Sequence, residues 1–245
     1  MNESFFSCYD FSMKVTHEML VGKTQDHLIP WDKDPNILFH KEMKNDFEQL
    51  CLDAKDAGFD LCICSGFRSF DRQLKIWNEK ATGKRQLLDT YGSPLSFSGL
   101  SEMEILYSIL RWSALPGGSR HHWGSDLDIY DANSLPENYQ IQLTPEEVSD
   151  DGMFGPFHNW LDEKIKNSEA YGFYRPFKVD RGGVATERWH LSYSPIADVY
   201  SQKLTLKTLS KTIQETEIEL KDLILDQLST IYDKFIINTC SSNDQ

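Results

Sequence analysis

A short segment near the middle of the chain, residues 126–130, alternates between polar and apolar side chains in the order Asp, Leu, Asp, Ile, Tyr. Successive side chains of a β-strand point to opposite faces, so this pattern predicts a strand with Leu127 and Ile129 on one face. Asp126 and Asp128 then share the other face. Any sheet that contains this strand therefore carries two carboxylates side by side.

Helical patterns occur on both sides of this strand. Apolar residues between 40 and 57 recur at three- and four-residue steps, and Gly58 follows as a stop signal. Ser69 is a suitable N-cap for a second helix, and Ser101 with Glu104 forms a capping box for a third. The predicted helices are 40–57, 70–81, the segment after Ser101, 157–166 and much of the chain beyond residue 197.

Two further strands are predicted. The apolar run 59–67 is bounded by glycines and predicts a buried strand, which places Arg68 at a strand-to-helix junction. Residues 187–194, ERWHLSYS, predict another strand after a Gly-Gly turn. The intervening segment 131–156 is rich in Pro, Asn, Asp and Glu, so we expect a long surface excursion with a possible short helix starting near Thr144.

Length and charge limit the classes of protein to consider. A chain of 245 residues can bury one substantial core. We expect one domain over residues 1–198 with an N-terminal arm, and a helical extension over 199–245 packed on it. The formal net charge of −13 disfavours phosphate-backbone contacts, so nucleic acid is not an expected partner.

The expected location is cytoplasmic. The N-terminal segment MNESFFSCYDFSMKV has no basic start followed by an apolar core, and no later segment approaches the roughly 18 apolar residues that span a bilayer. The five cysteines form no CxxC pair and are odd in number, which fits reduced thiols. Cys62 and Cys64 share a strand face, which leaves open a soft-metal pair or simple core packing.

Several separated residues could form a zinc site. Catalytic zinc usually takes three protein ligands from His and carboxylate and leaves a fourth position for water, whose pKa falls to about 7. His121, Asp128 and His190 offer such a set. Glu187, three positions before His190, could act as general base. Residues three apart lie on opposite faces of a regular strand, so this arrangement requires a bulge or an irregular start of the strand.

Arg68 could stabilise an oxyanion on the scissile carbonyl or hold a substrate carboxylate. Taken singly, each of these residues also has an ordinary structural explanation. Arg68 could form a surface ion pair, and a lone histidine such as His121 is more often structural than a ligand. A Glu-x-x-His pair is by itself a weak signal.

Three segments together resemble one family, the zinc D-alanyl-D-alanine carboxypeptidases of the VanY type, which are relatives of the VanX dipeptidases. The family pattern is Ser-x-His-x-x-Gly-x-Ala-x-Asp, followed much later by Glu-x-Trp-His. Residues Ser119, His121, Gly124, Asp128, Glu187, Trp189 and His190 match it. The segments are SGFRSFDRQLKIWN (65–78), SRHHWGSDLDIYD (119–131) and ERWHLSY (187–193).

The resemblance covers residues 40–200 and implies an α+β fold. In that fold a small antiparallel sheet carries the zinc site and helices flank the sheet, as in lysostaphin-type enzymes and the hedgehog signalling domain. It also implies one Zn²⁺ per chain, bound by His121, Asp128 and His190. Glu187 would activate water and Arg68 would stabilise the tetrahedral intermediate.

The resemblance further implies that Gln73, Ser119 and Trp189 contact the substrate. The chain departs from the family pattern at Asp126, which stands in place of a small residue. Asp126 could orient a ligand from behind, could be solvated, or could compete for the metal. His122 is a neighbouring histidine whose role as a ligand is the less favoured alternative.

The activity implied is removal of a C-terminal D-amino acid from peptidoglycan-derived peptides, with cytoplasmic precursors or recycled muropeptides as substrates and no membrane insertion. Two alternatives stay open. One is an endopeptidase acting on peptide crosslinks, which requires a groove open at both ends. The other is a non-catalytic zinc-containing binding module, against which the presence of Glu187 and Arg68 argues.

Overall fold

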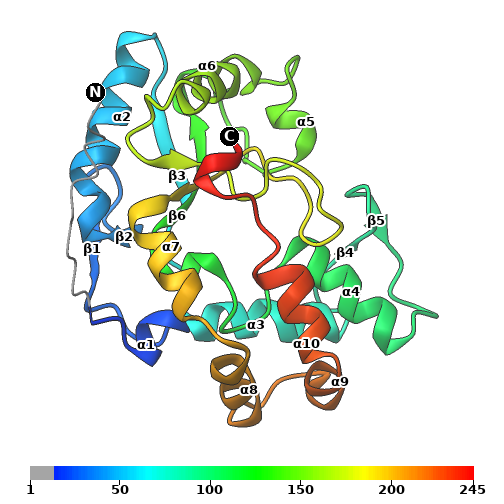
Figure 1. Ribbon diagram of the computed structural model, residues 1–245. Helices are drawn as coiled ribbons and strands as arrows, with labels where there is room; N and C mark the ends of the chain where they lie inside the picture. Colours follow the sequence, from blue (N-terminus) through cyan, green and yellow to red (C-terminus); the bar gives the residue numbers. More distant parts are fainter. Residues whose placement is uncertain (1–13) are drawn as a thin grey trace.

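The computed structural model describes residues 14–245 (Figure 1). Residues 1–13, which hold most of the segment inspected for a secretion signal, lie outside this part. The helices are α1 (His17–Leu20), α2 (Lys44–Asp56), α3 (Phe70–Ala81), α4 (Glu102–Trp112), α5 (Pro145–Val148), α6 (Gly155–Lys166), α7 (Ser194–Lys203), α8 (Leu206–Gln214), α9 (Lys221–Asp226) and α10 (Leu228–Ile231). The strands are β1 (Leu28–Pro30), β2 (Leu38–His40), β3 (Leu61–Ser65), β4 (Leu87–Leu88), β5 (Pro94–Leu95), β6 (Asp126–Asp131), β7 (Phe173–Tyr174) and β8 (His190–Tyr193).

The main sheet has four strands in the order β3-β6-β8-β7, and each pairing is antiparallel. Strand β6 is the segment whose alternation was described first, and it lies between β3 and β8. On its apolar face Leu127 and Ile129 are fully buried. The other face carries Asp126 and Asp128, which are also buried. The α+β fold expected from the sequence is confirmed, with two small hairpins, β1-β2 and β4-β5, beside the main sheet.

Local sequence signals explain where the helices around the sheet begin. Ser69 accepts a hydrogen bond from the backbone N–H of Arg72 and opens α3, which ends at Ala81 as predicted. Ser101 and Glu104 form the predicted capping box of α4. Helix α2 begins at Lys44, after a short 3₁₀ turn that occupies the first residues of the predicted helix. These boundaries fix Arg68 between β3 and α3.

The predicted strand over residues 187–194 is wrong at both ends. The strand starts only at His190, because the backbone N–H of His190 donates to the carbonyl of Glu187 and closes a turn there. Ser194 already opens helix α7, whose first turn contains a proline. The irregular start required for Glu187 and His190 to face the same point is therefore present, in the form of a turn.

Two glycines allow the close packing that positions the site. A Cβ on Gly66 would lie 2.4 Å from the carbonyl oxygen of Leu38, so only glycine fits where the chain leaves β3. Gly124 has φ of +71° and ends the 3₁₀ turn Arg120–Trp123, after which the chain enters β6. The ends of β3 and the start of β6 are thereby held together.

The C-terminal helices pack against the body of the protein. Buried side chains of α8, α9 and α10 belong to the same hydrophobic cluster as those of the sheet and of α2 to α4. Figure 1 shows α8, α9 and α10 beside α3 and α4, along the lower edge of the view. The boundary expected between the 1–198 domain and the helical extension falls inside helix α7. Among residues 14–245, the structure has no helix that combines the length and apolarity of a membrane span.

Candidate metal centre and cleft

Three elements deliver His121, Asp128 and His190 to one place. His121 comes from the 3₁₀ turn Arg120–Trp123, Asp128 from the middle of β6, and His190 from the first position of β8. Asp128 and His190 are direct partners across the β6-β8 ladder. Partners in an antiparallel pair hold their Cβ atoms roughly 5 Å apart, so the register itself brings these two side chains together.

The three side chains lie at distances suited to a shared cation. His121 Nε2 is 3.4 Å from Asp128 Oδ2, and His190 Nδ1 is 3.5 Å from Asp128 Oδ1. One candidate ligand atom from each residue lies within 4.8 Å of the other two. Within residues 14–245, no other group of three or more His, Cys, Asp or Glu side chains has such geometry. Cys62 and Cys64 are not part of the group.

Hydrogen bonds fix which ring nitrogens face the centre. His121 Nδ1 is 3.0 Å from the carbonyl oxygen of Gly66, so it donates there and leaves the Nε2 lone pair free. His190 Nε2 is 3.0 Å from Asp126 Oδ1, which leaves Nδ1 toward Asp128. His190 Nδ1 is buried and has no hydrogen-bond partner. Both rings therefore present one unshared lone pair to the same point, as metal-bound histidines do.

Asp126 is the support of His190. It is 0% exposed, so the alternative that it is solvated is wrong. Its Oδ1 also accepts a 2.7 Å hydrogen bond from Arg120 Nε, and its Oδ2 accepts one from the Ser125 hydroxyl. Burial opposes its ionisation, yet the Arg120 guanidinium and the hydrogen bond from His190 hold the pKa of Asp126 well below its usual value. Both oxygens point to these partners.

Arg120 was not singled out from the sequence, although it occupies the variable position of the Ser-x-His pattern. It is buried and donates to Asp126, to the hydroxyl of Ser192 at 2.7 Å and to the hydroxyl of Tyr174 at 2.9 Å. A buried arginine that binds side chains of three strands, β6, β7 and β8, holds the acidic support of His190 in place. An arginine directly before a histidine gave no periodic signal that would have indicated this.

Glu187 lies in the turn before β8. Its Oε2 is 3.4 Å from His190 Nδ1, beside the candidate ligand atoms. Burial disfavours a charged His190 ring, but the hydrogen bond to Asp126 and the nearby carboxylates of Asp128 and Glu187 outweigh this and raise the pKa of His190 well above the usual value. The site therefore attracts positive charge, which a proton or a metal cation can supply.

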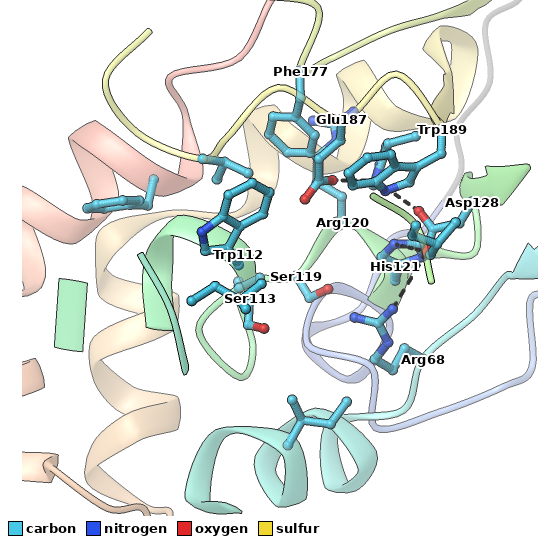
Figure 2. A pocket seen from close by; sticks show the side chains of 18 of the residues that line it. Arg68, Trp112, Ser113, Ser119, Arg120, His121, Asp128, Phe177, Glu187 and Trp189 are labelled. Atoms are coloured by element: carbon cyan, nitrogen blue, oxygen red, sulfur yellow. Dashed lines mark ion pairs between the residues drawn. The ribbon is translucent and has the colours of Figure 1, made fainter. Parts of the chain in front are cut away.

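Arg68 lies on the other side of the centre, as Figure 2 shows, with Glu187 opposite. Its guanidinium is 3.8 Å from Asp128 Oδ2 and donates to Gln73 Oε1 at 3.1 Å. Gln73 is fully buried, and its Nε2 donates to the carbonyl of Ala114 at 2.7 Å. Both ends of the Gln73 amide are thus bound to protein atoms, so this residue orients Arg68.

A cleft of about 360 Å³ opens onto the centre. Ser119 and Trp189 line it, and Figure 2 labels both among the side chains around the cleft. The ring of Phe177 packs edge-on against His190, with centroids 5.0 Å apart. Two residues of the C-terminal segment, Phe235 and Ile236, complete the wall, a contribution that the sequence pattern did not indicate.

His122 has a structural role. Its Nδ1 lies 2.6 Å from the carbonyl oxygen of Arg68, and its Nε2 accepts a hydrogen bond from the backbone N–H of Gly117. Burial lowers the pKa of His122 to about 3, so the ring is neutral. It ties the loop before the 3₁₀ turn to the start of α3, and it does not face the metal centre.

Residues 36–196 match the family model described as VanY, D-alanyl-D-alanine carboxypeptidase. The chain belongs to the VanY family. The match contains every candidate ligand together with Glu187 and Arg68, while the VanY model does not extend over α8 to α10. Phe235 and Ile236 therefore line the cleft from outside the matched region.

Individual proteins similar to this VanY-family chain include an uncharacterized protein of Haemophilus influenzae, 39% identical over 105 residues, which are 42% of this chain and 72% of that protein. A D-alanyl-D-alanine carboxypeptidase of Enterococcus faecalis is 29% identical over 156 residues, which are 61% of this chain and 47% of that protein. A solved structure of VanYB in complex with D-alanine-D-alanine has a TM-score of 0.48 at 23% identity, covering 76% of this chain and 88% of that one.

Proposed function

We propose that this protein is a zinc-dependent carboxypeptidase that removes a C-terminal D-alanine from peptidoglycan precursors or muropeptide stems. One observation carries the proposal. His121 Nε2, Asp128 and His190 Nδ1 converge on a single point in a cleft, with the carboxylate of Glu187 adjacent to them. Membership of the VanY family supports the same reaction class.

The residues present fit one zinc ion. Two neutral imidazoles and one carboxylate are the donor set of many catalytic zinc sites, and the unpartnered buried Nδ1 of His190 is the kind of atom that a metal satisfies. When bound in such a site, zinc lowers the pKa of a water ligand to about 7 and polarises a carbonyl oxygen. His121, Asp128 and His190 would hold the ion, and Asp126 would orient His190 from behind.

The protein side chains supply the proton transfer and the charge stabilisation. Glu187 takes a proton from the attacking water and returns it to the departing amino group. Arg68 holds the negative charge that develops on the scissile carbonyl oxygen. Gln73 holds the guanidinium of Arg68 by a hydrogen bond, and Ser119 and Trp189 line the cleft. That Gln73, Ser119 and Trp189 contact the substrate stays a prediction.

We further propose that residues 199–245 act as a helical extension of the 1–198 domain. Their contribution to function is the part of the cleft wall formed by Phe235 and Ile236. The Cδ1 atom of Ile236 packs closely over Gly118, just before Ser119. The proposed location is the cytoplasm, where soluble cell-wall precursors and recycled muropeptides would be the substrates.

The proposal predicts release of free D-alanine from a muramyl pentapeptide by the zinc-loaded protein, detected by mass spectrometry, and no release after zinc is removed with a chelator. A pentapeptide with an amidated C-terminus serves as the control. Cleavage of the amidated peptide at an unchanged rate would indicate an endopeptidase instead. Failure to cleave any peptide in the presence of zinc would contradict the proposal and favour a binding module.

A further inference from the structure

Lys80 occupies an unusual place for a lysine. It lies in the last turn of α3, and this helix forms one side of the cleft that leads to the metal centre. Lys80 is only 8% exposed, yet it lines the cleft. Its ammonium group donates a 2.6 Å hydrogen bond to the hydroxyl of Ser113, another cleft residue that Figure 2 shows on the side away from His121.

The cleft contains four Lys or Arg side chains, and three of them have a carboxylate partner. Arg120 pairs with Asp126 at 2.7 Å, Arg85 with Glu79 at 3.0 Å, and Arg68 lies 3.8 Å from Asp128. Within residues 14–245, no Asp or Glu forms an ion pair with the Lys80 ammonium, and its hydrogen-bond partner is the neutral Ser113 hydroxyl.

A buried ammonium without a counterion is costly, because it has lost most of its hydration and gained no opposite charge. Burial and the nearby cations Arg85 and Arg68 lower the pKa of Lys80 to about 8, against a smaller opposing effect of the more distant Glu187 carboxylate. Lys80 is therefore still mainly protonated at neutral pH. The end of α4 lies close by, since Ser113 is its C-cap residue, but a helix end contributes only about half a unit of negative charge.

We propose that Lys80, with the Ser113 hydroxyl beside it, forms a subsite that binds a carboxylate group of the peptide substrate. This inference rests on the proposed peptidase function and deepens it. The carboxylate supplies the counterion that the protein does not provide, and the ammonium anchors the peptide at a distance from the reacting carbonyl. Two carboxylates of a peptidoglycan stem could be the one bound: the C-terminal carboxylate or the α-carboxylate of a γ-linked glutamate.

The experiment measures peptide binding by calorimetry to zinc-loaded protein that carries Glu187→Gln, so that turnover is suppressed. It is done with and without Lys80→Met. The first peptide, diacetyl-L-lysyl-D-alanyl-D-alanine, has one carboxylate, at its C-terminus. The second is its C-terminal amide. The third is also amidated but carries an N-terminal γ-linked D-glutamate, whose α-carboxylate is its sole acidic group.

We expect Lys80→Met to raise the Kd of the first peptide by about 10- to 100-fold and to leave that of the amide unchanged, because a hydrogen-bonded charge pair is lost only with the first. An effect confined to the third peptide would support the subsite and assign it to the glutamate carboxylate. Equal Kd changes for all three peptides, or none for any, would overturn the proposal.

A second variant, Lys80→Gln, removes the charge but keeps a donor for Ser113, so it tests the charge should Lys80→Met fold poorly. It should reproduce the loss of affinity for the carboxylate peptide while keeping the melting temperature. Cleavage by the wild-type protein is assayed separately. A Lys80 effect on binding without any wild-type cleavage would refute the peptidase function alone, and cleavage without a Lys80 effect would refute the subsite alone.

Discussion

Replacing Glu187 with glutamine is expected to lower kcat by about 10²- to 10⁴-fold while the protein still binds one zinc ion. Glutamine keeps the size of the side chain and the turn before β8, but it cannot accept a proton from water. Glu187 is not among the three proposed ligands, although its Oε2 lies 3.4 Å from His190 Nδ1. The measurement combines steady-state kinetics of D-alanine release with the zinc content of the purified variant.

Glu163→Gln is the matched control for this substitution. Glu163 lies on the exposed side of α6, where its carboxylate pairs with Lys166, so the same chemical change there should leave both kcat and zinc content unaltered. Normal D-alanine release by the Glu187 variant would show that another group serves as the base. Loss of zinc from that variant would instead move Glu187 into the ligand set.

Replacing Asp126 with asparagine is expected to have the largest effect on stability, lowering the free energy of unfolding by about 3–5 kcal/mol. The substitution preserves shape but removes the charge that faces buried Arg120, whose remaining partners, Ser192 and Tyr174, are neutral. It also weakens the hydrogen bond that orients His190. Zinc affinity should therefore fall by about 10- to 100-fold, as when other supports of ligands are removed.

Asp131→Asn separates these two effects. Asp131 lies on the same strand and is also buried, but its Oδ1 accepts hydrogen bonds from the backbone N–H groups of Asp60 and Asn133 and its Oδ2 accepts one from the Ser134 hydroxyl, away from the metal centre. This variant should lose stability in urea denaturation and keep its zinc affinity. If Asp126→Asn bound zinc as tightly as the wild type, the role of Asp126 in orienting His190 would be wrong.

The sequence predicted those parts of the structure that depend on local periodicity. The alternation in β6 placed Asp126 and Asp128 on one face, and the capping residues Ser69 and Ser101 marked the starts of α3 and α4. The spacing of Glu187 and His190 was informative because it conflicted with a regular strand. That conflict indicated an irregular backbone, and the chain forms a turn there.

The long-range parts could not be derived from local patterns. A charged residue such as Lys80 in the last turn of an amphipathic helix is normally solvated, and only the packing of α4 against α3 buries it. The contact of Ile236 with Gly118 likewise joins segments more than 100 residues apart. The convergence of His121 with His190 followed from resemblance to a family, because residue spacing alone does not specify which strands pair.

The most direct test of the account is to locate the bound metal by anomalous X-ray diffraction at the zinc edge, from crystals of the zinc-loaded protein. The account predicts one strong peak per chain, within bonding distance of His121 Nε2, an Asp128 oxygen and His190 Nδ1. Asp126 should be hydrogen-bonded to His190 and should not touch the metal. A peak at another set of side chains, or bonded through the Nε2 atom of His190, would contradict the account.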